Sequence, residues 1–352
     1  MMHESRIDSA DTHNVVATVR GHLRKALAEP DCLDLSWVRR EPQSGEWSLA
    51  PDTLQIIANL VQQLEPKHIL EFGSGLSTYV FARVCDELKN SCCITSVDHD
   101  PEFGAATARR LTEKRVSQNV RIQIAPLIAR QCAGRLLPLY HLRPSDFAST
   151  RAPDLVLIDG PPLVLGGREG TLYQVMDFAR TGTLVILDDA KRPEEQAALS
   201  RWRAHLGSSI EVDYLANLRK GMAAITVREP VPIADLDGHH LRLTAGEIAA
   251  VIPQGDTFII VDENQFELNQ ISLGRSHVPF LERNGRYWGP PADDETAIAE
   301  LERLRKSGAS YMIFALPAFW WLEHYIDFQR YLRSRYQCIL ENDCLVVFDL
   351  GI

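Results

Sequence analysis

Acidic and glycine residues follow several short apolar runs of this sequence, where they could contact a bound ligand. Residues 68–78 read HILEFGSGLST, an apolar run that reaches Glu71 and continues into a Gly-Ser-Gly turn. Glycines let the backbone approach a ligand closely, and a helix that begins after the turn offers free N–H groups. The turn therefore indicates a ligand site, with a purely structural tight turn as the alternative.

A second acidic residue, Asp98, ends the next apolar run in the segment SVDHDP, 25 residues after Gly73. Its carboxylate could accept hydrogen bonds from both hydroxyls of a ribose that lies across the strand ends. Alternatively, Asp98 or Asp100 caps the helix that starts near Pro101. A nicotinamide-dependent oxidoreductase is disfavoured, because Thr78 stands where the dinucleotide fingerprint needs a third glycine and no Tyr-x-x-x-Lys occurs.

Two further apolar runs end in carboxylates, Asp159 in LIDGPP and the pair Asp188 and Asp189 in VILDDAKRP. The carboxyl ends of parallel strands share one rim, so these three carboxylates would repel one another unless cations neutralised them. Such hard oxygen ligands suit Mg²⁺ or Ca²⁺, which makes the three residues a candidate metal site. The alternative is that Asp188 or Asp189 caps the next helix and pairs with Lys191 or Arg192.

A third interpretation gives this rim a catalytic role. Asp159 would take a proton from an acceptor hydroxyl, and the acceptor would lie over Asp159 and Asp188. Arg168 and Arg192 would hold an anionic group of the substrate through bidentate contacts.

The elements that position these residues alternate between β-rich and helical patterns from about residue 52, which predicts a parallel sheet covered by helices on both faces. We expect five parallel strands and a final antiparallel hairpin, at residues 68–72, 93–97, 120–125, 154–158, 183–187, 209–216 and 222–228. The expected helices are 52–64, 77–89, one that begins near 101, 169–180 and 193–205. Residues 126–150 carry no clear pattern.

The segments EFGSG, SVDHD and DLVLIDGPP, with this strand order, resemble the class I S-adenosylmethionine-dependent methyltransferases over about residues 45–228. The resemblance implies an α/β fold with a seven-stranded Rossmann-like sheet. In that family the glycine turn holds the methionine part of the cofactor, the acid of strand two holds the ribose, and the loop after strand three flanks the adenine. Carried over, the cofactor-binding residues are Glu71, Gly73, Ser74, Gly75, Asp98, His99, Ala125, Leu127 and Asp159.

The acidic rim is also similar to that of metal-dependent catechol-type O-methyltransferases, which place an Asp after strand four and an Asp-Asn pair after strand five. This sequence departs from that pattern in two ways. Asp189 replaces the Asn, and the Lys that follows the strand-four Asp is absent from DGPPLV. Mg²⁺ is therefore expected only as an optional second cofactor, held by Asp159, Asp188 and Asp189.

A second, weaker β/α series follows Pro230, Pro232 and the segment DLDGHH. We expect an N-terminal helical extension at 1–44, the methyltransferase domain at 45–229, a linker at 230–244 with solvated His239 and His240, and a smaller α/β domain at 245–352. Its expected elements are strands 257–261, 311–315, 337–340 and 345–349, helices 293–306 and 318–334, and a loop at 275–291.

This C-terminal part is similar to an accessory domain found beside bacterial glycan-related methyltransferases and glycosyltransferases, a resemblance that implies no activity. We expect its aromatic cluster to be core packing. The alternative is a platform for a sugar, to which Tyr287 and Trp288 would contribute. The cluster comprises Trp320, Trp321, His324 and Tyr325.

Composition restricts the partners. Lys plus Arg number 37 and Asp plus Glu 47, a formal net charge of −10, so a basic footprint for nucleic acid or anionic membranes is not expected. No apolar run approaches the roughly 20 residues of a membrane span, and the polar N-terminus has no secretory signal. The seven cysteines form no Cys-x-x-Cys motif and are expected to be reduced, mostly buried thiols in a cytoplasmic protein.

These observations together predict an S-adenosylmethionine-dependent methyltransferase. Its expected acceptor is a saccharide or glycan precursor, or another small hydroxyl compound, and the methyl group is expected to go to oxygen. The alternatives are a metal-dependent enzyme for catechol-like acceptors and a non-catalytic, cofactor-binding partner protein of a glycan pathway.

Overall fold

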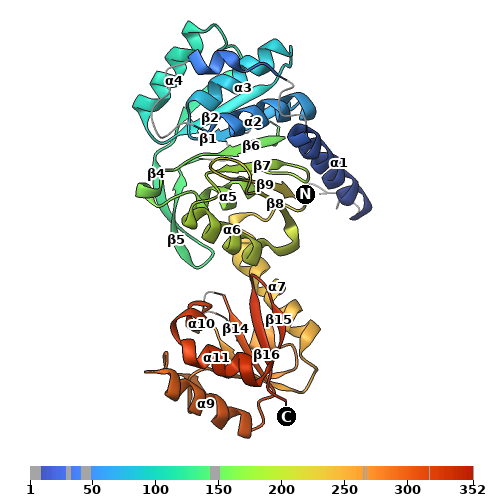
Figure 1. Ribbon diagram of the computed structural model, residues 1–352, viewed down its shortest axis with the longest axis vertical. Coiled ribbons are helices and arrows are strands. Elements are labelled where there is room, and N and C mark those ends of the chain that lie inside the picture. The colour runs from blue at the N-terminus through green and yellow to red at the C-terminus, as the bar shows by residue number, and fades with distance from the viewer. Residues whose placement is uncertain are drawn as a thin grey trace, which may run out of the picture. The chain divides into compact units, whose positions relative to one another are not determined.

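The structure is a computed structural model that describes residues 9–28, 33–40, 49–142, 151–264, 266, 268–316 and 318–351. The chain divides into two compact units (Figure 1). The first comprises Met1–Leu199 and Ser208–Leu236, and the second comprises Ser200–Gly207 and Asp237–Ile352. Each unit has its own sheet and its own hydrophobic core.

The first unit contains a seven-stranded sheet of order β3-β2-β1-β6-β7-β9-β8. β1, β2, β3, β6 and β7 run parallel, and β9 and β8 are antiparallel to their neighbours, which confirms the predicted Rossmann-like arrangement. The strands are β1 (His68–Phe72), β2 (Cys93–Asp98), β3 (Val120–Ile124), β6 (Leu155–Ile158), β7 (Leu184–Asp188), β8 (Ile210–Leu215) and β9 (Met222–Val227).

The central strands are continuous apolar runs because they are buried on both faces. Every residue of β1, β6 and β7 is buried. On one face Ile69, Leu157 and Ile186 join a core formed with residues of α1, α2 and α3. The helices of the unit are α1 (Ser9–Ala28), α2 (Pro51–Leu64), α3 (Leu76–Glu87), α4 (Pro101–Glu113), α5 (Glu169–Met176) and α6 (Pro193–Leu206), whose last residues belong to the second unit.

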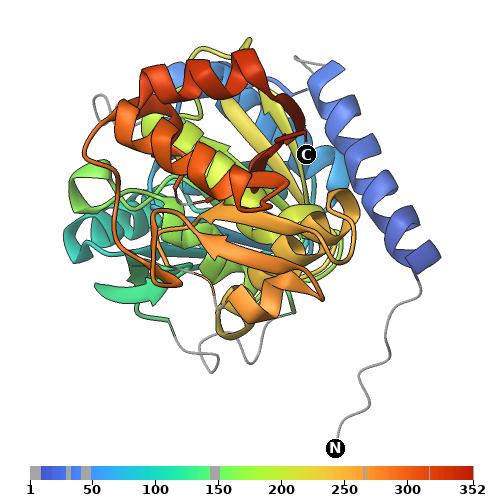
Figure 2. The same cartoon turned by 90° about the horizontal axis from the view of Figure 1, so that it is seen from below.

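α1 lies within the expected N-terminal helical extension, and α5 is shorter than expected. α1 begins at Ser9 and packs on α2, and it is the long blue helix in Figure 2. Arg20 of α1 bonds the β8 carboxylates Glu211 and Asp213, so the helix belongs to the first unit. α5 ends at Met176 rather than near residue 180, because the chain turns there toward β7.

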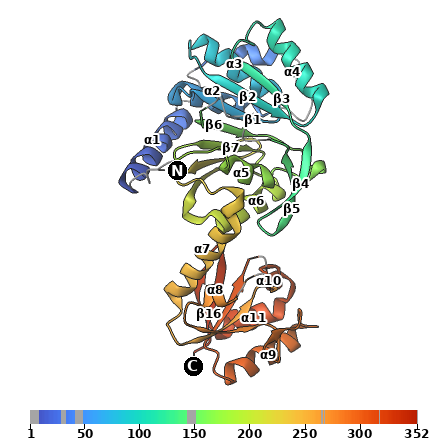
Figure 3. The same ribbon diagram turned by 180° about the vertical axis from the view of Figure 1, so that it is seen from behind.

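A β-hairpin fills part of the segment that had no predicted pattern. β4 (Leu127–Cys132) pairs with β5 (Arg135–Tyr140) in a small sheet of their own (Figure 3). Most of β4 is exposed or half-buried, so burial imposes little apolar alternation on its sequence. The hairpin is fixed at Tyr140, whose backbone N and O both bond the side chain of Gln174, at 3.1 and 2.6 Å.

The second unit contains a five-stranded sheet of order β11-β10-β14-β16-β15. Its strands are β10 (Thr257–Val261), β11 (Ser276–Pro279), β14 (Tyr311–Ala315), β15 (Gln337–Glu341) and β16 (Leu345–Asp349), with a hairpin of β12 (Glu282–Arg283) and β13 (Arg286–Tyr287). Its helices are α7 (Leu236–Val251), α8 (Leu268–Ser272), α9 (Asp294–Lys306), α10 (Trp320–His324) and α11 (Ile326–Arg335). The expected loop at 275–291 thus contains a parallel edge strand, and the expected helix at 318–334 breaks at Tyr325.

The segment that we expected to be a linker, 230–244, contains the first turns of α7. His239 and His240 are half-buried there rather than fully solvated, and His239 Nε2 lies 3.2 Å from the Leu206 carbonyl. His240 Nδ1 lies 3.2 Å from the Ala204 carbonyl, and burial lowers the pKa of this histidine. The prediction was wrong because Asp, Gly and His in DLDGHH suit a turn, whereas helix packing decides the conformation.

The aromatic cluster is divided between core and surface. Trp321 and Tyr325 are buried, as the core interpretation predicts. Trp320 is 39% exposed, and its Nε1 donates a hydrogen bond to Glu263 at 2.8 Å.

Two further expectations concern the whole chain. No helix among the described residues is long and apolar enough to cross a membrane. The six cysteines of the described residues form no disulfide, and four of them are buried. Cys32 lies outside the described residues.

Candidate functional site

The turn between β1 and α3 lies directly against the turn that follows β6. Gly73 has φ of +98°, and a Cβ there would lie 3.3 Å from the backbone of Asp159 and Gly160. Only glycine fits this position without strain. At Gly75, the N-cap of α3, a Cβ would meet no atom within 4 Å, so the turn is open on that side.

Asp98 connects the end of β2 to this glycine turn. Its Oδ2 accepts hydrogen bonds from Ser74 N at 2.8 Å and Ser74 Oγ at 2.6 Å. Its Oδ1 accepts from Asp100 N at 2.9 Å, with His99 Nδ1 at 3.4 Å. The helix N-cap is Asp100, which accepts from Glu102 N at 2.8 Å, so the capping alternative describes Asp100 and not Asp98.

A cavity of about 190 Å³ opens beside the turn. It brings together three of the predicted site residues, Ser74, Gly75 and Asp159. The other predicted residues do not line it, although Ala125 N donates to the Asp98 carbonyl and Leu127 begins β4 close by in sequence. The lining residues are Leu49, Ser74, Gly75, Leu76, Ser77, Phe103, Ala106, Thr107, Arg110 and Asp159.

Glu71 is a fully buried acid beneath the glycine turn. Its Oε2 accepts hydrogen bonds from Thr78 Oγ1 at 2.5 Å and Ser96 Oγ at 2.7 Å. Its Oε1 has no hydrogen-bond partner among the described residues. Burial raises the pKa of Glu71 to about 7, so the carboxyl is partly protonated near neutral pH.

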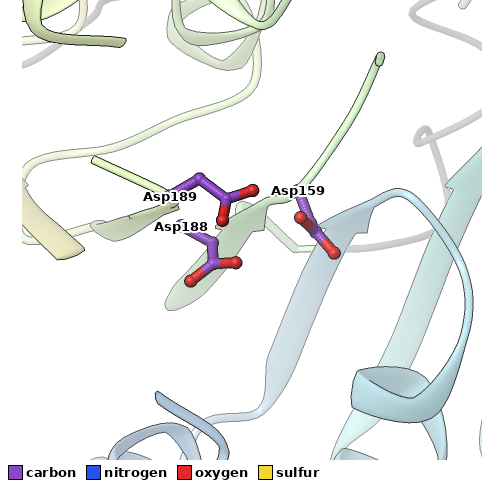
Figure 4. A group of neighbouring side chains, drawn as sticks. All are labelled: Asp159, Asp188 and Asp189. Atoms are coloured by element: carbon purple, nitrogen blue, oxygen red, sulfur yellow. The ribbon is translucent and has the colours of Figure 1, made fainter. Parts of the chain in front are cut away.

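Three carboxylates converge where β6 and β7 end. One oxygen each of Asp159, Asp188 and Asp189 lies within 4.8 Å of the others, and Figure 4 shows the three side chains grouped at these strand ends. Burial and the neighbouring carboxylates raise the pKa of Asp159 well above its ordinary value, although Arg168 opposes the shift. Burial also raises the pKa of Asp188, whose Oδ2 has no partner among the described residues.

The guanidinium of Arg168 lies within this group. One terminal nitrogen, Nη2, bonds Asp159 Oδ1 at 2.8 Å and Asp189 Oδ2 at 2.9 Å. The other, Nη1, donates to the carbonyl of Asp188 at 2.7 Å. The side chain is 6% exposed, and Glu195 lies 3.8 Å from its Nε.

Two more cations approach Asp189 from the outer side. Arg192 Nη2 lies 2.9 Å from its Oδ2, as the pairing alternative predicts, and Lys220 Nζ lies 3.3 Å from its Oδ1. Arg168 and Arg192 thus both bind protein carboxylates, which gives no support to their expected role of holding a substrate anion.

Sequence reasoning missed Tyr140 and Lys220. The Tyr140 side chain is 1% exposed, its ring lies 5.2 Å from that of Phe72, and its Oη has no partner among the described residues. A Cβ at Gly160 would lie 2.4 Å from this Oη, so the phenol reaches the turn after β6. Tyr140 lies in the segment that had no pattern and Lys220 in a surface hairpin turn, so neither carried a signal.

Comparison with known proteins agrees with this geometry. Residues 70–190 match the family model of a methyltransferase domain. No curated protein matches the chain. With the strand order described above, the family match identifies the first unit as a class I S-adenosylmethionine-dependent methyltransferase domain.

Two solved structures illustrate the similarity. A methyltransferase of Podospora anserina, bound to S-adenosylhomocysteine, is 15% identical over 64% of this chain and 99% of its own, with a TM-score of 0.42. The O-methyltransferase TomG of Streptomyces achromogenes, in complex with S-adenosylmethionine, is 17% identical over 64% of this chain and 99% of its own, with a TM-score of 0.40.

The Asp98 carboxylate offers a test of the cofactor site. We expect Asp98→Asn to weaken binding of S-adenosylhomocysteine about 5- to 150-fold, or about 1–3 kcal/mol, because hydrogen bonds to a charged acceptor are lost. Isothermal titration calorimetry would measure the dissociation constant of S-adenosylhomocysteine for each variant. Asp100→Asn is the matched control, since it changes the neighbouring cap alone and should leave the affinity unaltered; equal losses in both variants would contradict the assignment.

The buried Glu71 predicts a pH dependence of stability. Its pKa is about 7 in the folded chain against 4.5 ordinarily, so the unfolded state ionises first as the pH rises. Titration of Glu71 should by itself lower the free energy of unfolding by about 3 kcal/mol between pH 4.5 and pH 7, and Glu71→Gln should remove this contribution. The free energy of unfolding would be measured by urea denaturation at each pH. Hydrogen–deuterium exchange of β1 and β6 would give an independent measurement.

The control for this measurement is Glu113→Gln, which removes an exposed carboxylate from α4. Its pH profile should match that of the wild type. A wild-type profile in the Glu71→Gln variant would show that Glu71 is not the titrating group.

Proposed function

We propose that this class I methyltransferase transfers a methyl group from S-adenosylmethionine to a hydroxyl oxygen of a small acceptor, with Asp159 as the general base. The observation that carries the proposal is the position of Asp159. It lines the same cavity as Ser74 and Gly75 of the glycine turn, so a proton acceptor lies beside the expected cofactor site.

The residues of the glycine turn suit the expected cofactor. Asp98 presents a carboxylate to the turn, where the ribose hydroxyls would bind in place of, or beside, Ser74. Gly75 leaves open space, and Glu71 Oε1 is an acceptor without a partner among the described residues. We propose Glu71, Gly73, Ser74, Gly75 and Asp98 as the core of this site, and His99, Ala125 and Leu127 at its adenine side.

The bound cofactor would supply an electrophilic methyl group. The protein must then position the acceptor oxygen in line with it and remove the hydroxyl proton. Arg168 holds Oδ1 of Asp159, which leaves Oδ2 to accept that proton. Because its pKa is raised, Asp159 is a stronger base than an ordinary Asp, and it is therefore better suited to accept a hydroxyl proton.

For the acceptor we propose a saccharide or glycan precursor. The support comes from exposed aromatic side chains of the second unit, since flat aromatic faces bind sugar rings. Trp288 is 64% exposed, with the Arg283 guanidinium 4.2 Å from its ring centroid, and Trp320 is 39% exposed. We also propose a cytoplasmic location, in which the enzyme would act on such a precursor before export.

Turnover of Asp159→Asn tests the proposal. We expect kcat to fall about 10²- to 10⁴-fold, because the amide cannot accept the proton. The affinity for S-adenosylhomocysteine should change little by comparison. For the wild type, kcat/KM should fall as the pH is lowered through the raised pKa of Asp159, because only the ionised form is the base.

The assay would measure methyl transfer from labelled S-adenosylmethionine to a panel of nucleotide-linked and lipid-linked sugars, with catechol as the competing acceptor. Asp86→Asn, an exposed change on α3, is the matched control. Wild-type turnover in Asp159→Asn would contradict the role of the base. Turnover of catechol alone would contradict the saccharide, and cofactor binding without any turnover would favour a non-catalytic partner protein.

A further inference from the structure

The acidic rim resembles a magnesium site, but both oxygens of Asp189 and Oδ1 of Asp159 already lie against cationic side chains. A Mg²⁺ ion binds oxygens at about 2.0–2.1 Å in an octahedral arrangement. At Asp189, Oδ2 bonds Arg168 and Arg192, and Oδ1 lies 3.3 Å from Lys220. At Asp159, Oδ1 bonds Arg168 at 2.8 Å. The side chains as placed therefore do not fit a metal ion.

We propose that Arg168 is a built-in cation that stands where a divalent metal would otherwise bind, so that this methyltransferase works without one. The inference rests on the proposed function for the reaction, although the occupancy of the acidic rim does not depend on it.

The charges support this assignment. The three rim carboxylates Asp159, Asp188 and Asp189 face three cations, Arg168, Arg192 and Lys220, and Glu195 adds a fourth carboxylate. A buried guanidinium remains charged, and these carboxylates raise the pKa of Arg168 further. A divalent ion placed beside it would meet a fixed positive charge at short range among largely buried side chains, which is strongly unfavourable.

The planar guanidinium also differs from a spherical metal ion in the direction of its contacts. It donates along fixed directions to Asp159, Asp189 and the carbonyl of Asp188, and so connects the ends of β6 and β7. Arg168 bonds only Oδ1 of Asp159, so it orients the proposed base and leaves Oδ2 available to accept a proton. Arg168 is therefore a positioning residue for Asp159.

Removing the guanidinium should expose the site that it fills. In Arg168→Ala, the three carboxylates would face an emptied space, and Asp188 Oδ2 is already without a partner among the described residues. We expect this variant to bind Mn²⁺, a spectroscopic substitute for Mg²⁺, and the wild type to bind none. Binding would be measured on the full chain by electron paramagnetic resonance and calorimetry, with neither cofactor nor acceptor present.

Arg192→Ala is the matched control. It removes an arginine from the same carboxylate, Asp189, but leaves Arg168 in place, so it should gain no Mn²⁺ site. Arg168→Gln, which keeps side-chain length without charge, replaces the alanine variant if that chain fails to fold. Arg168→Lys should bind no Mn²⁺ but should shift the pH at which kcat/KM falls, because its single ammonium cannot make the same contacts to Asp159.

Wild-type activity should survive excess EDTA and should not rise with added Mg²⁺. Micromolar Mn²⁺ binding by the wild type, or activity that EDTA removes and Mg²⁺ restores, would overturn the proposal. So would a folded Arg168→Ala or Arg168→Gln chain that binds no Mn²⁺. These binding results are separate from the assignment of the base, because loss or retention of turnover in Asp159→Asn does not alter them.

Discussion

The contact between Arg168 and the carboxylates of Asp159 and Asp189 is the interaction on which the site depends. Both acids end buried parallel strands, where neither could remain ionised alone without a large cost in desolvation. The guanidinium compensates them from inside the rim, and Arg192 and Lys220 do so from outside. Charge balance at this edge of the sheet thus comes from three segments: Arg168 follows β6, Arg192 follows β7, and Lys220 lies in the β8–β9 turn.

A second constraint acts through the backbone. The turn after β1 and the turn after β6 approach so closely at Gly73 that a methyl group there would press on the backbone of Asp159 and Gly160. The glycine turn and the proposed base are therefore spaced by main-chain packing, whereas the orientation of the base is set by the side chain of Arg168. Tyr140, from a separate hairpin, packs against the same turn.

Much of this arrangement could be predicted from sequence, because strands that are buried on both faces are apolar throughout. β1, β6 and β7 are buried throughout, and they read as continuous apolar runs with acids at their ends. The glycine turn and Asp98 were equally visible from spacing. Arg168 was a predicted site residue, but the sequence did not show that it contacts the acids and not a substrate. Lys220 of the β8–β9 turn and Tyr140 of the unpatterned hairpin were not predicted, because their contacts join segments that are distant in sequence. In the second unit, α7 was missed because its helix is determined by packing and not by its turn-like residues.

The β4–β5 hairpin has an implication for how the domain could diversify. Its two strands form a sheet of their own, so residues near its tip can change without altering the register of the seven-stranded sheet. Its root is tied to the site through the Gln174 bonds to the backbone of Tyr140 and the contact of the Tyr140 ring with Phe72. Farther along, β5 packs on α5, and Arg135 near the tip lies 3.7 Å from Glu169. The exposed residues of the hairpin could therefore vary with the molecule that the domain contacts. Tyr140 would meanwhile keep its position beside the turn after β6, so the site itself would not change.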